Sequence, residues 1–460
     1  MGDVDLVVKG GKIATPRGFV EGGIAIDGVK IISVSKEHRL PSAVNVIDCA
    51  GKVVLPGLVD AHVHVFGPGW IRETFGPGTR AAAVGGVATL LDMPSPGALA
   101  GTTVQAFDRK RVRAEREAYV DFGLYGGEIE RWAHAQMMKK IVALGAVGFK
   151  MITGGPGFVA EDVLLEAFKR IQSVGSVAVL HAEDQTLIRY FLQVAREEAR
   201  VDPAAFTEFR PSLVEKEAVR RVMLLASLCR NRLHLAHLTS EEALETVRKA
   251  KSTGLRVTAE TCPHYLLLSA NDYRKYGHRM VVTPPIKTRK DSEALWRGVS
   301  DGTIDIIASD HCPYYKKQKD SGLGCVWETP LGIPGLETML PLLLSEGVNR
   351  SRISLRRLMQ LVCEAPAKIF GLYPRKGVIN PGSDADLTVV DLKLRHRVDA
   401  EHFECAGDFS PFDDWRLRGA PVKTIVRGNV VAEDGQIVGS EGFGRFVRPD
   451  RRTWSIRKGK

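Results

Sequence analysis

The sequence predicts an α/β fold, a (β/α)8 TIM-like barrel with a small β-sandwich domain formed by both chain termini. Two observations lead to this prediction. Apolar, β-branched segments recur eight times along the middle of the chain, and stretches with helical periodicity separate them. Further strand-like runs remain at both ends, and 460 residues exceed what one barrel needs.

The eight segments have the composition of buried parallel strands, with few charged residues and many β-branched ones. They cover residues 58–64, 87–94, 119–126, 146–151, 177–183, 233–238, 256–262 and 304–310. Helical patterns, with apolar residues three and four apart, include residues 161–173, 211–230 and 241–251. This alternation predicts a barrel over residues 55–379.

The two ends of the chain predict the second domain. Strand-like runs occupy residues 5–13 and 23–26 near the start, and 385–390 and 424–431 near the end. The runs at 7–13 and 425–431 are similar and suggest hairpin-like units. We expect residues 1–54 and 380–445 to form one β-sandwich. Residues 446–460 are expected to form a solvated basic tail.

Polar donors follow several of the predicted barrel strands. His62 and His64 lie two residues apart, so a strand directs both side chains the same way. His-x-His alone is a weak signal, but four further donors stand at or just past the carboxyl ends of strands four, five, six and eight, where barrel enzymes carry their chemistry. These are Lys150, His181, His237 and Asp310. Four histidines and an aspartate suit zinc, manganese, iron or cobalt, so we expect a binuclear metal centre.

Lys150 is an unusual metal ligand, because an ammonium group repels cations. Burial among Val147, Phe149 and Met151 would favour the neutral amine. A neutral amine can add carbon dioxide, and the resulting carbamate can bridge two metal ions. The alternative is a buried lysine paired with an acid, and the five other donors favour the carbamate.

A series of ordered motifs resembles the cyclic amidohydrolases, the group of dihydroorotases, allantoinases and hydantoinases within the amidohydrolase superfamily. The motifs span nearly the whole chain and include Val-Leu-Pro-Gly-Leu-Val-Asp-Ala-His-Val-His (54–64), Asp-Met-Pro (92–94), Gly-Phe-Lys (148–150), His-Ala-Glu (181–183), Ala-His-Leu-Thr-Ser (236–240), Glu-Thr-Cys-Pro-His-Tyr-Leu (260–266) and Ser-Asp-His-Cys-Pro (309–313). The resemblance implies that the six donors are the family's metal ligands, with Lys150 carboxylated.

The reaction implied by this resemblance is metal-assisted hydrolysis of a ring amide. Two divalent ions, zinc by the family's pattern, would activate a bridging hydroxide and polarise the ring carbonyl. Asp310 would act as general acid and base, carrying the hydroxide proton to the departing ring nitrogen. The alternative reading of Asp310 is a helix cap after strand eight.

The substrate is indicated by residues that the chain lacks. Dihydroorotases hold the substrate carboxylate with an arginine and an asparagine, where this chain has Val65-Phe66 and Ser95. Hydantoinases place a tyrosine where Gly155 stands and an asparagine where Leu331 stands. Other motifs resemble allantoinases. We expect a neutral ureide ring, allantoin or a hydantoin, with dihydroorotate as the alternative substrate.

Several further residues lie near the predicted centre in the sequence. His264, Ser95 and Leu331 are candidate substrate contacts, although a structural role for His264 is equally compatible with the sequence. His234 is out of phase with His237, so we expect it to pack on the outer face of its strand. Residues 153–157 are glycine-rich and predict a mobile loop over the barrel mouth.

The composition restricts the remaining possibilities. A net charge of +10 could indicate nucleic acid, but seven of the lysines and arginines lie in residues 445–460, so no nucleic-acid partner is expected. Seven irregularly spaced cysteines and the lack of a signal peptide or membrane span predict a cytoplasmic protein. The resemblance implies a homo-oligomer. It also admits a non-catalytic scaffold, which the six filled ligand positions disfavour.

Overall fold

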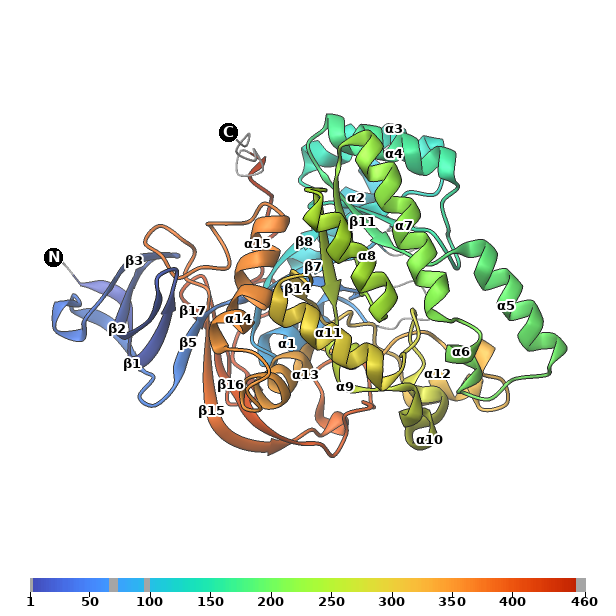
Figure 1. Cartoon of the computed structure of the whole chain (residues 1–460). Helices are drawn as coiled ribbons and strands as arrows, with labels where there is room; N and C mark the ends of the chain where they lie inside the picture. The colour runs from blue at the N-terminus through green and yellow to red at the C-terminus, as the bar shows by residue number, and fades with distance from the viewer. Residues whose placement is uncertain (1–2, 66–72, 95–99, 452–460) are drawn as a thin grey trace.

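The computed structural model describes residues 3–65, 73–94 and 100–451, and its central part is the predicted barrel (Figure 1). The eight barrel strands are β6 (Leu58–Val63), β7 (Val87–Asp92), β8 (Asp121–Leu124), β10 (Phe149–Ile152), β11 (Val177–His181), β12 (Arg232–Leu235), β13 (Val257–Thr261) and β14 (Ile306–Ile307). Each lies within one of the eight predicted segments or overlaps it. The predicted fold class is confirmed.

Parallel pairing closes these strands into a ring. One sheet has the order β6-β7-β8, and the other runs from β14 through β13, β12, β11 and β10 to the short strand β9 (Gly126–Glu128). The Val147 amide donates to the Leu124 carbonyl at one junction between the sheets, at 3.0 Å. At the other junction, a parallel bridge joins Val63 to His311. The carboxyl ends of all the strands therefore meet at one mouth.

Helices follow the strands and cover the barrel. The longer ones are α1 (Phe75–Val84), α2 (Val104–Glu117), α3 (Trp132–Leu144), α4 (Glu161–Ser173), α5 (Gln185–Glu197), α7 (Ser212–Cys229), α8 (Glu241–Ser252), α11 (Arg289–Asp301) and α13 (Leu336–Leu342). Short helices are α6 (Ala205–Glu208), α9 (Pro263–Leu267), α10 (Tyr273–Tyr276), α12 (Lys316–Lys319), α14 (Leu355–Met359) and α15 (Ala365–Ile369). The three predicted helices correspond to α4, α7 and α8.

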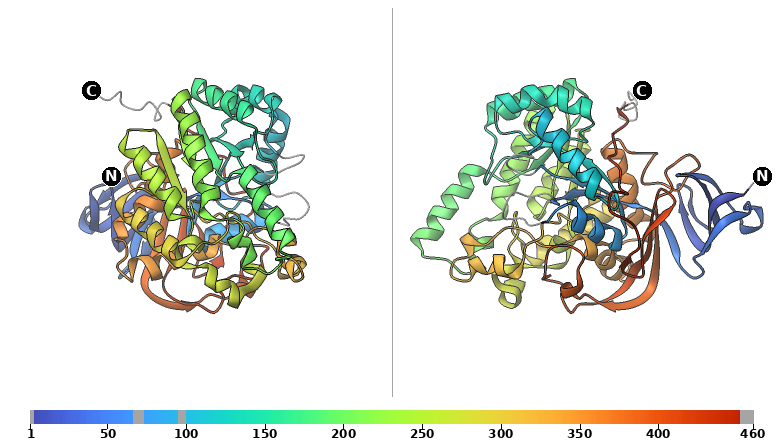
Figure 2. Two further views of the ribbon diagram at one scale, coloured as in Figure 1. Left: turned by 45° about the vertical axis from the view of Figure 1, so that its right-hand side comes forward. Right: turned by 180° about the vertical axis from the view of Figure 1, so that it is seen from behind.

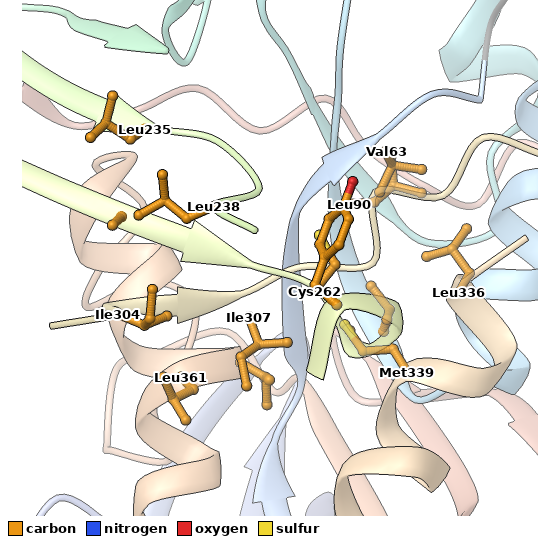
Figure 3. Packing of buried hydrophobic residues seen from close by; sticks show 14 of the residues in the cluster. Val63, Leu90, Leu235, Leu238, Cys262, Ile304, Ile307, Leu336, Met339 and Leu361 are labelled. Atoms are coloured by element: carbon orange, nitrogen blue, oxygen red, sulfur yellow. The ribbon is translucent and has the colours of Figure 1, made fainter. Parts of the chain in front are cut away.

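Strand alternation divides the core into two layers. Side chains such as Val59, Leu91 and Val179 fill the barrel interior together with Phe370. The other faces of the strands pack against the helices, where Leu90 and Ile307 meet residues such as Met339 of α13 (Figure 3). Functional side chains can reach the mouth only from the interior positions.

Strands from both chain ends form a single nine-stranded sheet beside the barrel (Figures 1 and 2). Its strands are β1 (Val4–Thr15), β2 (Gly18–Asp27), β3 (Lys30–Ser35), β4 (Ala43–Asp48), β5 (Val53–Pro56), β15 (Leu387–Arg397), β16 (Arg416–Val426), β17 (Asn429–Glu433) and β18 (Gln436–Ile437). The two ends join where β5 pairs with both β1 and β15. This confirms a β-rich terminal domain, while the division of the chain at residues 54 and 380 stays a prediction.

The two runs expected to be similar hairpins differ. Residues 7–13 lie within one continuous strand, β1, whose register shifts between Lys9 and Gly11. This bulge explains the Gly-Gly pair without a turn. Residues 425–431 do form a hairpin, because Arg427 and Gly428 both have positive φ, as a two-residue primed turn requires.

The start of the predicted solvated tail is packed against the barrel, so that prediction is wrong for residues 446–451. The Val447 amide donates to the Phe122 carbonyl at 2.7 Å, and Phe446 contacts the rings of Phe107 and Phe122. Apolar residues among the arginines made this docking possible. Residues 452–460 lie outside the described part of the chain. No helix within that part combines the length and apolar character needed to span a bilayer.

Candidate metal centre

The first half of the candidate centre lies at the end of β6. His62 is fully buried, and its Nε2 lies 3.2 Å from Oδ1 of Asp310. Nε2 of His64 lies 3.5 Å from the same oxygen. The two histidines therefore point the same way, as the His-x-His spacing predicts, and they converge on the aspartate that follows β14.

The second half is supplied by β10, β11 and the segment after β12. His181 Nδ1 and His237 Nε2 face each other at 3.1 Å. The Nζ of Lys150 lies 3.5 Å from His62 Nε2, so the lysine stands between the two halves. All six predicted ligands line the same cavity, which has a volume of about 530 Å³.

Two of the six residues have unusual backbone conformations. His237 has a φ of 33° and Asp310 a φ of 48°, both in the left-handed region that residues with a Cβ rarely adopt. Such strain persists only where the surrounding structure holds it, and it is concentrated at functional sites. Here it turns each side chain into the mouth directly after its strand ends.

The donor set fits divalent cations. Burial lowers the pKa of His62 and of His237 well below the ordinary value, so neutral rings with free lone pairs are favoured. The ring nitrogens of His181 and His237 face each other at 3.1 Å, which matches the spacing of two ligands on one metal ion. Burial also lowers the pKa of Lys150, although Asp310 opposes this shift, and the neutral amine is the form that can become a carbamate.

Two carboxylates that the sequence reasoning missed orient these histidines. Glu260 Oε1 lies 2.5 Å from His62 Nδ1 and accepts from the His237 amide at 3.2 Å. Glu183 Oε2 lies 2.9 Å from His181 Nε2. These contacts leave the opposite ring nitrogens free for a metal. The sequence motifs could have indicated both acids, since Glu183 ends His-Ala-Glu and Glu260 begins Glu-Thr-Cys.

His234 corrects another expectation, because it points into the barrel and not outward. Its Nε2 lies 3.2 Å from Glu260 Oε2, and its ring contacts Phe370 edge-on at 5.4 Å. The expectation assumed regular strand alternation from residue 234 to 237. Strand β12 ends at Leu235, and the left-handed turn at His237 allows both histidines to face the interior.

The candidate substrate contacts are only partly visible. His264 and Leu331 line the cavity, and the buried Nε2 of His264 has no hydrogen-bond partner among the described residues. Ser95 and Phe66 lie outside the described residues. Residues 154–157 of the predicted loop also line the cavity, whereas their mobility stays a prediction.

Charged residues that the sequence did not single out complete the cavity wall. Arg210 lines it, but its Nη1 lies 3.3 Å from Glu183 Oε2 and 2.8 Å from Thr283 Oγ1. The carboxylates of Glu128 and Glu130 line the cavity near Lys150. Burial raises the pKa of Glu128, and the positive charge of Lys150 opposes the shift.

Residues 53–431 match the model of the amidohydrolase family. The chain belongs to the amidohydrolase family. Three relatives show where this amidohydrolase lies within it. The solved structure of an L-hydantoinase (dihydropyrimidinase) from Arthrobacter aurescens superposes with a TM-score of 0.92 at 37% identity, covering 97% of this chain and 100% of the other. An allantoinase from Rubrobacter xylanophilus is 35% identical, covering 98% of this chain and 99% of the relative.

The third relative is a dihydroorotase from Methanothermobacter thermautotrophicus, 35% identical over 92% of this chain and 93% of its own. The three names match the group that the motifs predict. Membership of the cyclic amidohydrolases is therefore confirmed, and with it the prediction of a hydrolytic enzyme. The same relatives differ in the ring that their names specify, so they leave the substrate of this amidohydrolase to be proposed.

Proposed function

We propose that this amidohydrolase opens a neutral ureide ring, either allantoin or a hydantoin. The observation that carries the proposal is the convergence of six donor side chains on one cavity of about 530 Å³. That volume suits a small cyclic substrate. The hydantoinase and the allantoinase described above support the choice of ring.

Two divalent ions, with zinc as the first choice, would be held by the residues predicted from the sequence, namely His62, His64, Lys150 as its carbamate, His181, His237 and Asp310. When bound, such ions polarise the ring carbonyl and lower the pKa of water so that it can attack near neutral pH. Glu260 and Glu183 keep the histidine rings in the orientation that this binding needs.

Asp310 moves the proton in this proposal. Burial opposes ionisation of its carboxyl, but the contacts with His62 and His64 hold the pKa below its ordinary value, so the group is ionised and able to accept a proton from the attacking water. It then passes that proton to the ring nitrogen, which is otherwise a poor leaving group. His264 lies on the same cavity and supplies a polar contact to the substrate.

Dihydroorotate is the second candidate, because Arg210 lines the cavity and could contact a carboxylate. The positive charge of Arg210 is already matched by Glu183. Val65, at the position where dihydroorotases carry an arginine, is fully buried and hydrogen-bonded through its amide to Asp92 at 3.0 Å. These contacts favour the neutral ring.

The test is a hydrolysis panel of allantoin, hydantoin, dihydrouracil and dihydroorotate with the metal-loaded protein, repeated with Asp310→Asn. We expect the variant to keep its fold, because the substitution is nearly isosteric, and to lose turnover by at least about 100-fold. Asp162→Asn, an exposed substitution at the start of α4, is the matched control and should be neutral. Near-normal turnover of Asp310→Asn would assign the proton transfer to another group.

Metal content gives a readout that does not depend on choosing the right substrate. Elemental analysis should find about two transition-metal ions per chain, and Lys150→Ala should lose one or both. Short carboxylic acids should partly restore activity to Lys150→Ala, because they can take the place of the carbamate. Active protein without any metal would contradict the proposal.

A further inference from the structure

Parts of β15 and β16 extend beyond the other strands of the nine-stranded sheet, and these parts carry several arginines. Beyond residue 390, β15 no longer pairs with β5, and before residue 423, β16 does not pair with β17. These parts form a two-stranded ribbon, visible below α1 and α13 in Figure 1. In its register Arg395 lies opposite Arg418, and Arg397 lies opposite Arg416.

Strand alternation places all four guanidinium groups on one face of the ribbon. Residues directly opposite each other in an antiparallel pair point to the same side, and so do residues two apart. All four arginines are exposed, whereas Leu417 between two of them is buried. Like charges directly opposite each other destabilise a strand pair. The ribbon therefore holds two repulsive pairs side by side.

Carboxylates do little to relieve this repulsion within the described residues. Arg397 lies 2.8 Å from Asp414, whose side chain is highly exposed, and 3.9 Å from Asp399, which is also partly exposed. For Arg395, Arg416 and Arg418, no carboxylate of the described chain lies within 4.0 Å. The excess positive charge therefore faces solvent.

Two adjoining hollows extend this cationic surface. The larger, of about 580 Å³, is lined by the four ribbon arginines and by Arg350. The smaller, of about 310 Å³, shares Arg350 and Arg416 with it. The smaller hollow adds Arg289 and Arg352, which lie 3.5 Å and 3.0 Å from Glu293, and also two tryptophans, Trp296 and Trp415. Glu346 is the one acid among the described residues lining either hollow, and it pairs with Arg350 at 2.6 Å.

We propose that these hollows bind a small multivalent anion bearing phosphate groups. Guanidinium groups match phosphate oxygens with paired hydrogen bonds, and an anion placed over the ribbon would relieve both repulsive pairs. The hollows have the volume of a small-molecule site and share no lining residue with the metal cavity. The site is thus separate from the catalytic centre. The phosphate groups can be free or can belong to a nucleotide, whose base the half-buried Trp415 would contact.

The experiment is calorimetric titration of the full-length protein with tripolyphosphate at low salt. The test variant is Arg395→Gln combined with Arg416→Gln, and the control is Arg196→Gln combined with Arg220→Gln, exposed residues of α5 and α7 with the same loss of charge. We expect saturable binding to wild type and control, and at least a tenfold weaker affinity in the test variant. Tripolyphosphate should also raise the Tm of wild type and of the control, and not that of the test variant.

Further arms identify the source of the phosphate. Tighter binding of a nucleoside triphosphate than of tripolyphosphate would support the site and assign the base to the hollow with Trp415. Equal binding would support a site for the phosphate groups alone. The proposal is overturned if tripolyphosphate does not saturate, if test and control variants bind alike, or if only long nucleic acid binds. The arginines would then protect the open edges of the ribbon from aggregation.

Discussion

At the scale of single residues, Glu260 is the side chain on which the candidate centre depends most after the ligands themselves. Its carboxylate is fully buried and contacts the rings of His62 and His234 and the backbone amide of His237. It therefore holds one ligand from each half of the centre.

Glu260→Gln should weaken metal binding by about 10- to 100-fold, the range typical for loss of a group that orients a metal ligand. The amide keeps the shape but loses the charge that favours a metal-ready His62. Competition with a zinc chelator measures the effect without any substrate. Glu337→Gln, a buried substitution on α13, is the control and should leave metal affinity unchanged. Equal zinc affinity in wild type and Glu260→Gln would assign Glu260 a packing role only.

The carboxyl group of Glu337 should make the free energy of unfolding depend on pH. Burial raises the pKa of its carboxyl from 4.5 to about 8, although the Cys405 amide donates to it at 3.2 Å. Between these two values the folded protein retains a proton that the unfolded chain releases, so stability falls as the pH rises through this window. Below pH 4.5 both forms are protonated and the contribution is fully present.

Glu337→Gln mimics the protonated form and should remove this loss. Thermal unfolding followed from pH 5 to pH 9 should give similar Tm values for variant and wild type at the acidic end. The variant should become progressively the more stable of the two as the pH rises toward about 8, and the difference should level off above that pH. Parallel Tm curves across the whole range would show that Glu337 ionises normally.

At the scale of secondary-structure elements, one buried lysine joins the barrel to the terminal sheet. Nζ of Lys376 lies 2.6 Å from Asp121 Oδ2 at the start of β8 and 2.6 Å from Asp386 Oδ2 just before β15. It also lies 3.1 Å from Asp384. Arg427, in the turn after β16, belongs to the same cluster, because its Nε lies 3.1 Å from Asp121 Oδ1. Burial disfavours the ammonium, but these carboxylates outweigh it and raise the pKa of Lys376.

Lys376→Met should destabilise the protein by about 3–5 kcal/mol, because it leaves buried carboxylates without their cation. The measurement is the Tm together with the yield of folded protein. Lys30→Met is the control, since Lys30 pairs with Asp384 from a largely exposed position and should change stability by no more than about 1 kcal/mol. Equal Tm values for the two variants would mean that the junction tolerates uncompensated charge.

At the scale of the whole molecule, the cavity combines the charges of several distant segments. Arg210 is matched by Glu183, while Glu128 and Glu130 add negative charge to the wall. A substrate carboxylate would be poorly paired there and would lose about 1–3 kcal/mol per missing charged hydrogen bond.

We therefore expect kcat/KM for allantoin or an unsubstituted hydantoin to exceed that for dihydroorotate by at least about tenfold, which corresponds to about 1.4 kcal/mol. The comparison uses one metal-loaded preparation, so that the metal content is the same for every substrate. If dihydroorotate is the best substrate, Arg210 must turn from Glu183 to the carboxylate, and Arg210→Gln should then abolish that preference.

The sequence alone predicted the barrel, its strand positions and the six residues that the structure brings to one cavity. Each of these depends on local patterns, because buried parallel strands are apolar throughout and the catalytic groups follow them directly in the chain. His62, Lys150 and Asp310 are examples, each at or just past the end of a recognisable strand.

Tertiary structure alone decided which residues distant in the sequence come into contact. Glu260 meets His62 across 198 positions of the chain, and Lys376 meets Asp121 across 255. The inward turn of His234 depends on the backbone strain at His237, and the docking of residues 446–451 depends on backbone pairing between Phe446 and Phe122 of β8. Periodicity reports only the near neighbours of a residue, whereas these contacts arise when the closed barrel brings distant strands together.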